Sequence, residues 1–153
     1  AQLSGNEIVL DTYCGIGTIG LYMAPVAKHV YGVEIVPSAI QDAKQNALIN
    51  HFDNTTFECG KAEEVIIEWK QKGIEPDVIM VDPPRKGCDQ VFIETLLELA
   101  PKRIIYISCN PSTQQRDAQL LANLYYLKEI TPVDMFPHTT HIETVALFER
   151  KTL

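Results

Sequence analysis

The 153 residues carry a net charge of −7, and 46% of them are hydrophobic and 22% charged. This composition fits one globular domain, and the acidic balance argues against a chain that binds a nucleic acid unaided, because such binding depends on positive charge. There is no run of about 18 apolar residues and no basic-then-apolar start, which argues against a membrane span and a secretory signal. Four cysteines without a Cys-x-x-Cys pair predict free thiols in the cytoplasm, and we expect a monomer.

Apolar runs and amphipathic segments alternate along the chain, which predicts strands and helices in turn. The expected strands are Glu7–Asp11, His29–Glu34, Thr55–Cys59, Asp77–Val81, Arg103–Ser108, Tyr126–Pro132 and Thr144–Phe148. The expected helices are Gly17–Ala27, Pro37–His51, Ala62–Lys72, Gln90–Leu99 and Ser112–Asn123, with Ser112 as the expected N-cap. Five strand–helix units predict a doubly wound α/β fold with a mostly parallel, seven-stranded sheet. The last two strands lack an intervening helix and should form an antiparallel hairpin at one edge.

The loop after the first strand combines glycines with acidic residues. Gly15 and Gly17 allow a sharp turn and a close approach of the backbone to a ligand. Glu34 ends the second strand, where an acid accepts the hydroxyl groups of a ribose. Gly15-x-Gly17-x-x-Gly20 also fits the dinucleotide fingerprint, which leaves NAD as an alternative cofactor. Asp11 would repel a pyrophosphate but suits the cationic, amino-acid-bearing end of S-adenosyl-L-methionine, which we expect instead.

Two further loops follow the third and fourth strands, at the edge where open α/β sheets bind ligands. Lys61 and Ala62 lie where such sheets contact adenine, and the backbone N–H of Ala62 is a candidate donor. In Asp82–Gly87 the prolines make the loop rigid and leave Asp82 as an acceptor for cofactor or substrate. Arg85 stands where amino-methylating enzymes of this fold carry an aromatic residue, and the loop lacks the Pro-Cys nucleophile common in cytosine-C5 enzymes.

Cys109 follows the apolar fifth strand directly, and a thiolate is a strong nucleophile. A buried structural thiol is the ordinary alternative, but the adjacent nucleoside site favours a catalytic role. Glu143, which enters the last strand, is the candidate general base. His138 and His141 precede it and are candidate bases or loop-positioning residues. Their His-x-x-His spacing resembles half a metal site, but no third ligand has suitable spacing, and we expect no metal.

Taken together, these motifs resemble the catalytic domain of the RNA uridine-C5 methyltransferases over nearly the whole chain. Asp11–Gly17 match the glycine loop of that family, and Asp82–Arg85 match its Asp-Pro-x-Arg. Cys109 falls on the nucleophile of Ser-Cys-Asn-Pro-x-Thr, and Glu143 on the base of Phe-Pro-x-Thr-x-His-x-Glu. The cofactor contacts implied by the resemblance are Tyr13, Thr18, Glu34 and Lys61, beside Asp11, Gly15, Gly17, Ala62 and Asp82. The residues implied to position the substrate are Asp82, Arg85, Asn110 and His141.

The resemblance implies a class I, Rossmann-like methyltransferase fold, with residues 1–153 as the S-adenosylmethionine-dependent domain and C-terminal fragment of a longer protein. It implies methylation of carbon 5 of a uridine through a covalent bond between Cys109 and carbon 6. We expect 23S rRNA as the target, with tRNA as the alternative, and RNA binding mainly by N-terminal domains outside this fragment. An RNA cytosine-C5 methyltransferase and, more distantly, a dehydrogenase are the enzymatic alternatives. The alternative of another class is a module that only binds cofactor and RNA.

Overall fold

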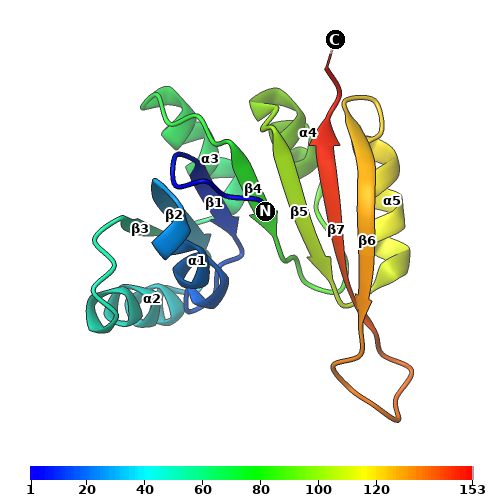
Figure 1. Ribbon diagram of the computed structural model, residues 1–153, viewed down its shortest axis with the longest axis horizontal. Helices are drawn as coiled ribbons and strands as arrows, with labels where there is room; N and C mark the ends of the chain where they lie inside the picture. Colours follow the sequence, from blue (N-terminus) through cyan, green and yellow to red (C-terminus); the bar gives the residue numbers. More distant parts are fainter. Residues whose placement is uncertain (153) are drawn as a thin grey trace.

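Seven strands form one sheet in the order β3-β2-β1-β4-β5-β7-β6 in the computed structural model, which describes residues 1–152 (Figure 1). The strands are β1 (Ile8–Thr12), β2 (His29–Glu34), β3 (Thr55–Cys59), β4 (Val78–Val81), β5 (Arg103–Ser108), β6 (Tyr125–Val133) and β7 (Glu143–Arg150). Strand β7 is antiparallel to both of its neighbours, β5 and β6, and the other adjacent strands are parallel. The expected mostly parallel sheet with an antiparallel edge is confirmed, and the reversed strand β7 lies one place inside the edge strand β6.

The helices are α1 (Thr18–Met23), α2 (Pro37–Ile49), α3 (Ala62–Gln71), α4 (Gln90–Leu99) and α5 (Pro111–Leu121), and the 3-10 turn η1 (Ala24–Val26) follows α1. The expected continuous helix over 17–27 is therefore wrong in its second half. Pro25 has no N–H to donate to Leu21, and the chain tightens into the 3-10 turn. None of the helices in residues 1–152 has the length and apolar composition that a membrane span requires.

The expected N-cap of the last helix is also wrong. Pro111 is the first helical residue of α5, and Asn110 is the N-cap. The side-chain oxygen of Asn110 accepts a hydrogen bond from the Ser112 N–H at 3.2 Å. A proline at the first helical position leaves no N–H unsatisfied, so the helix begins one residue earlier than predicted.

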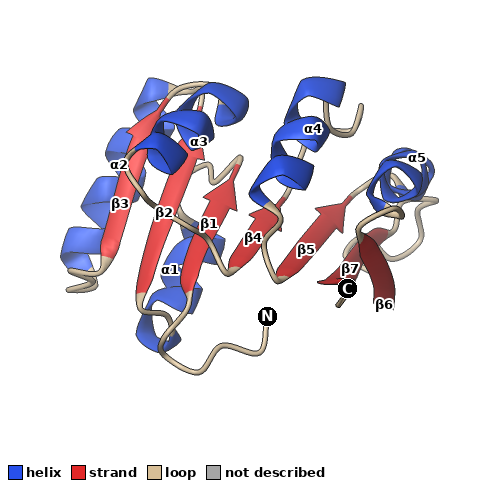
Figure 2. Cartoon of the chain, turned by 90° about the horizontal axis from the view of Figure 1, so that it is seen from above, coloured by secondary structure: helices blue, strands red, loops and turns tan. Residues whose placement is uncertain are grey.

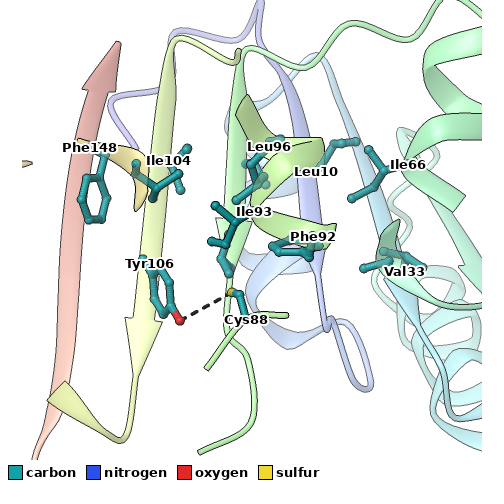
Figure 3. Packing of buried hydrophobic residues seen from close by; sticks show 14 of the residues in the cluster. Leu10, Val33, Ile66, Cys88, Phe92, Ile93, Leu96, Ile104, Tyr106 and Phe148 are labelled. Atoms are coloured by element: carbon teal, nitrogen blue, oxygen red, sulfur yellow. Dashed lines mark hydrogen bonds between the residues drawn. The ribbon is translucent and has the colours of Figure 1, made fainter. Parts of the chain in front are cut away.

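Helices α3, α4 and α5 cover one face of the sheet, and α1 and α2 cover the other (Figure 2). Under α3–α5, strand residues such as Leu10 and Ile104 pack against Phe92 and Leu96 of α4 (Figure 3). All four residues of β4 are buried, because a parallel strand covered on both faces needs apolar side chains on both. The loops at the carboxyl ends of the strands are therefore built on a rigid base.

The pairing register decides which residues share a face of the sheet. Asp11 pairs with Met80, Met80 with Ile105 and Ile105 with Leu147, so these side chains point to the α1 face. Side chains alternate along a strand, so Glu143 lies on the same face as Leu147, and Asp82 and Cys109 directly follow the last residues of β4 and β5. Because β7 is reversed, its first residue lies at the edge where β1, β4 and β5 end.

Candidate active site

A cavity of about 670 Å³ opens at the carboxyl ends of β1, β2, β3 and β4. The loop after each of these strands contributes to its wall, and five of the residues expected to hold a cofactor line it: Tyr13, Glu34, Lys61, Ala62 and Asp82. The volume lies within the usual range for small-molecule sites, about 300–1,000 Å³. The cavity spans the position between β1 and β4 where the strand order reverses, which is where open α/β sheets bind ligands.

The β1–α1 loop adopts the sharp turn that its glycines predict. Gly15 and Gly17 have φ values of 53° and 82°, and Tyr13 has a φ of 61°. A Cβ atom on Gly17 would lie 3.0 Å from the ring of Phe57, so both its conformation and its packing require glycine. Thr18 is exposed at the first position of α1.

Glu34 is fixed in place by the same loop. Its Oε2 accepts a hydrogen bond from the Gly15 N–H at 3.2 Å, and its Oε1 accepts one from the Val36 N–H at 3.0 Å. A carboxylate oxygen can accept more than one hydrogen bond. Glu34 therefore retains the capacity to accept the hydroxyl groups of a ribose in the cavity.

The remaining cavity residues lie at the start of α3. Ala62 is the first residue of this helix and Lys61 its N-cap, so backbone N–H groups are available near the cavity. The Lys61 ammonium forms an ion pair with Glu64 at 2.9 Å. Ala62 is thus placed to offer a backbone donor, while the Lys61 side chain has a partner on its own helix.

Asp11 lies next to the glycine loop but is only 1% exposed and is outside the cavity wall. Its Oδ2 accepts a hydrogen bond from the Gly20 N–H at 2.8 Å, and a Cβ atom on Gly20 would lie 2.8 Å from the same oxygen. Burial raises the pKa of Asp11 to about 7; the Gly20 hydrogen bond opposes this rise and the charge of Asp82 adds to it. Direct contact with a cofactor stays a prediction for Asp11.

Carboxylates are concentrated at this edge of the sheet. Burial raises the pKa of Asp82, and the negative charge of Glu143 raises it further. Asp82 in turn raises the pKa of Asp11. A positively charged ligand beside these groups would relieve their mutual repulsion. This group of carboxylates therefore fits a cationic cofactor such as S-adenosyl-L-methionine, which carries a sulfonium.

Cys109 and Glu143 come together through the register of β5 and β7. The last pair of this ladder is Ser108 with Thr144, and the next residues along the two strands are Cys109 and Glu143. Opposed residues of an antiparallel pair, such as Ser108 and Thr144, have Cα atoms about 4.5–5.5 Å apart. The expected nucleophile therefore directly follows Ser108, and the expected base directly precedes Thr144, at the end of the ladder, although 34 positions separate Cys109 from Glu143 in the sequence.

The other cysteines are less suited to nucleophilic chemistry at this edge. Cys14 and Cys88 are buried, and burial raises the pKa of both thiols, that of Cys88 to about 12. The Cys88 thiol also donates a hydrogen bond to the Tyr106 hydroxyl at 3.5 Å (Figure 3). Cys59 is exposed but ends β3, two strands away from β1. Cys109 is half-buried and lies at the end of β5.

Arg85 connects three loops near Cys109. Its Nη2 lies 3.1 Å from Nδ1 of His141, and its carbonyl oxygen accepts hydrogen bonds from Asn110 at 3.2 Å and Thr113 at 3.3 Å. Three of the residues expected to position the substrate, Arg85, Asn110 and His141, are thus linked through Arg85. His138 is exposed in the loop 134–142, which extends beyond this edge of the sheet (Figure 1). Within residues 1–152 no three His, Cys, Asp or Glu side chains are grouped to hold a metal ion.

Asp117 of α5 is a buried residue next to the proline loop that the sequence motifs did not indicate. It is fully buried, and its Oδ2 accepts hydrogen bonds from the Cys88 N–H at 2.8 Å and the Tyr106 hydroxyl at 2.6 Å. Its Oδ1 accepts a hydrogen bond from Nε of Arg116 at 2.8 Å. Asp117 therefore joins α5 to β5 and to the end of the proline loop.

Gln114 was also missed, although its spacing carried a signal. Gln114, Asp117 and Leu121 lie at positions i, i+3 and i+7 of α5, and all three are buried. This spacing describes one face of a helix. A polar residue on a helix face that also carries a core leucine is a candidate for a specific buried contact.

The fold and the cavity define a class I, Rossmann-like methyltransferase domain. The chain belongs to the tRNA (uracil-5-)-methyltransferase family, whose model matches residues 2–151. S-adenosyl-L-methionine is the cofactor of this family. The expected family, fold and cofactor class are confirmed.

Similar proteins agree with this assignment. RNA methyltransferases of Staphylococcus aureus (strain COL) and Staphylococcus epidermidis (strain ATCC 12228), both named as uncharacterized, are each 78% identical over 151 residues. The matches cover 99% of this chain and 33% of each relative, so the chain spans about one third of the length of these curated relatives.

Solved structures give the same result. The tRNA (uracil-54, C5)-methyltransferase of Pyrococcus abyssi, in complex with S-adenosyl-L-homocysteine, is 38% identical with a TM-score of 0.83, over 95% of this chain and 35% of that one. An rRNA methylase of Streptococcus thermophilus has a TM-score of 0.77 at 11% identity, over 98% of this chain and 90% of that one. The second likeness concerns the fold alone.

Proposed function

We propose that the whole protein that carries this chain transfers a methyl group from S-adenosyl-L-methionine to carbon 5 of a uridine in RNA. The observation that carries the proposal is the Ser108–Thr144 pair that ends the β5–β7 ladder, because it brings the neighbouring Cys109 and Glu143 to the sheet edge where the cavity opens. Membership of the uracil-5 family supports uracil as the base. The chain would be the catalytic domain of that protein, and its free thiols suit the reducing cytoplasm.

The cofactor would be held by residues of the four loops that form the cavity. Glu34 accepts the ribose hydroxyl groups, the Ala62 N–H faces the adenine, and Asp82 with Asp11 offsets the positive charge of the amino-acid end. Tyr13 and Thr18 complete the contacts, with Gly15 and Gly17 allowing the backbone to approach. When bound, S-adenosyl-L-methionine supplies an electrophilic methyl group on a sulfonium.

The chain supplies the groups that make uracil reactive. Carbon 5 of uracil is a poor nucleophile until the Cys109 thiolate adds to carbon 6, which breaks the 5,6 double bond and places electron density on carbon 5 and the carbonyl at carbon 4. Glu143 removes the proton that remains on carbon 5 after methylation. The electron pair of that C–H bond re-forms the double bond, and the bond between carbon 6 and sulfur breaks to release Cys109.

The substrate must reach this site as a nucleotide turned out of its stack. Arg85, held by Asn110 and His141, lies at the mouth and brings positive charge to the carboxylate-rich edge. A nearby cation also favours the thiolate form of a cysteine. We assign Arg85, Asn110, His141 and Asp82 to the positioning of the uridine.

The covalent mechanism is tested by two variants of the whole protein, assayed with labelled S-adenosyl-L-methionine and uridine-containing RNA. Cys109→Ala should reduce methylation by at least about 10³-fold while cofactor binding persists, because the nucleophile is lost. Glu143→Gln should accumulate a protein–RNA adduct on a denaturing gel, because methylation precedes proton removal. Cys59→Ala, which changes an exposed thiol far from Cys109, is the matched control.

Substantial turnover by Cys109→Ala would refute covalent catalysis, and absence of an adduct with Glu143→Gln would refute the role of Glu143 as base. Wild-type protein that transfers no methyl group in a single turnover would be a cofactor- and RNA-binding module. Methylation of cytidine in place of uridine would make it a cytosine-C5 enzyme.

We propose 23S rRNA as the target, and the family description and the Pyrococcus abyssi match favour tRNA as the second candidate. Mapping 5-methyluridines in cells that lack the gene separates the two. Loss of a modified position from 23S rRNA supports the first, and loss from tRNA replaces it with the second.

A further inference from the structure

We infer that Gln114 is a positioning residue that sets the distance between Cys109 and Glu143; the inference rests on the proposed function. Gln114 lies on α5 and is 3% exposed. Its Nε2 donates a hydrogen bond to the Tyr106 carbonyl oxygen at 2.9 Å, and its Oε1 accepts one from the Thr144 hydroxyl at 2.8 Å. A single side-chain amide therefore ties the helix to β5 and β7 at once.

The two hydrogen bonds of the Gln114 amide form a bridge between β5 and β7, close to Cys109 and Glu143 in the sequence. Thr144 is opposite Ser108 in the last pair of the ladder, and its hydroxyl is also 3.3 Å from the Ser108 carbonyl oxygen. Cys109 follows Ser108 directly after β5, and Glu143 precedes Thr144 at the start of β7, so one peptide bond joins each of them to this pair. Gln114 thus touches neither residue, and it acts on both through the backbone to which they are attached.

This end of the ladder needs such support. Cys109 lies past the last residue of β5, and Glu143 is the first residue of β7. Strand ends have fewer ladder hydrogen bonds and open more readily than strand centres. A general base must reach its proton within about 2.6–3.2 Å, and a displacement of about 1 Å can cost about 10²-fold in rate.

Packing alone does not require glutamine at this position. Gln114 shares its buried helix face with Leu121, which is fully buried, and a leucine has nearly the same size as a glutamine. Burying an amide is unfavourable unless its donor and acceptor are both paired, and here both are. The polar side chain adds a fixed connection between the strands that an apolar one cannot make.

The geometry is tested first, without the methylation reaction. In the whole protein, Glu143→Cys introduces a second thiol beside the Ser108–Thr144 pair, and a disulfide with Cys109 forms only when the two Cα atoms come within about 7 Å of each other. The rate at which this introduced thiol forms a disulfide with Cys109 under a mild oxidant is followed by peptide mass spectrometry. Adding Gln114→Leu should slow it by about tenfold or more, because the strand ends separate more often. Gln115→Leu, an exposed neighbour on the same helix, should leave the rate unchanged.

The second measurement is turnover in the protein with Cys109 and Glu143 intact. Gln114→Leu should lower kcat by about tenfold while KM for S-adenosyl-L-methionine changes less than about twofold, because the cavity is formed by other loops. Thr144→Val removes the hydroxyl with little change in shape and should have the same effect. Thr144→Ser retains the hydroxyl and should restore kcat, which a purely space-filling role would not do.

The outcomes separate this inference from the proposed function. Unchanged disulfide formation and unchanged kcat in both Gln114→Leu and Thr144→Val would overturn the positioning role while wild-type uridine methylation stands. Slower disulfide formation in a wild-type background that methylates no uridine would overturn the proposed function while the geometric bridge stands. A lower melting temperature with neither rate changed would reduce Gln114 to a structural residue.

Discussion

At Asp11, burial and hydrogen bonding change the pKa of one carboxyl group in opposite directions. Burial raises the pKa to about 7 from the ordinary 3.8, and the hydrogen bond from Gly20 limits the rise. The folded state therefore binds a proton more tightly than the unfolded state. Stability contributed by this proton is fully present below about pH 4 and is lost as pH rises through about 7.

We expect Asp11→Asn to remove this dependence. The amide oxygen can still accept the hydrogen bond from Gly20, and the buried site no longer holds a charge at high pH. A rise of about three pKa units corresponds to about 4 kcal/mol, so the variant should unfold at a higher temperature than wild type at about pH 8 and differ less at about pH 5. Thermal unfolding across this range is the measurement. Asp53→Asn, at an exposed carboxylate, is the control, and parallel pH profiles for wild type and Asp11→Asn would contradict the argument.

Among the elements, the loop between β4 and α4 depends most on its contact with α5. Gly87 has a φ of 79°, and a Cβ atom there would lie 2.6 Å from Nη2 of Arg116 and 2.7 Å from Oδ2 of Asp117. The buried Asp117 carboxylate also accepts the Cys88 N–H. The position of the proline loop is therefore determined by a helix that begins beside Cys109.

Gly87→Ala should destabilise the protein and lower methyl transfer, and Gly73→Ala is its matched control. Gly73 has the same φ of 79° but open space around a Cβ atom, so both variants carry the left-handed backbone cost of about 1–2 kcal/mol. Gly87→Ala should lose a further 1–3 kcal/mol or so through the clash, and only this variant should displace Asp82 and Arg85. Denaturant unfolding and turnover measure the two effects. Equal losses in both variants would show that the contact with Asp117 carries no energy.

The secondary structure could be predicted largely from apolar patterning, because buried parallel strands read as continuous apolar runs. The range Gln90–Leu99 agrees with α4 residue for residue. Strand and helix ends differ where a local contact decides them. Strand β1 continues to Thr12, whose hydroxyl donates to the Met80 carbonyl oxygen at 2.6 Å. Helix α2 ends at Ile49, before His51 takes a φ of 58°.

The topology of the sheet brings some of the residues of the candidate site to one edge, while their roles stay predictions. Asp82 and Cys109 follow neighbouring parallel strands, so the same sheet edge collects them. Gln114 and Asp117 could not be found in this way, because a polar residue on the buried face of α5 interrupts the apolar period that marks a core position. Thr144, which Gln114 contacts, and Cys88, which Asp117 contacts, are 30 and 29 positions away in the sequence, and only the packed structure identifies these partners.

For the whole molecule, charge is the property that bears most on RNA binding. The chain carries a net charge of −7, while Arg85, Lys86 and Arg116 gather near the proline loop. Nucleic-acid affinity rises with the number of phosphates that cations neutralise. Lys86 and Arg116 also form ion pairs with Asp89 and Asp117, so we expect this small group of cations to contribute few phosphate contacts.

We expect residues 1–153 alone to bind uridine-containing RNA at least about 10²-fold more weakly than the whole protein, whose curated relatives are about three times longer than this chain. The logarithm of affinity should also fall less steeply with salt for the chain, because fewer counterions are released. Titrations at several salt concentrations measure both quantities. Equal affinity and equal slope would place the RNA-binding surface on the chain itself.

The reversed direction of β7 also constrains how the chain can change in length. Glu143 and Thr144 are adjacent in sequence, yet the side chain of Glu143 lies on the α1 face of the sheet and that of Thr144 on the face under α5. Insertion of a single residue within β7 would exchange these faces and turn the carboxylate toward Gln114. Insertions in the loop 134–142 leave the register of β7 unchanged. Insertions and deletions among homologues of this protein should therefore occur in the loop 134–142 and be absent from β7.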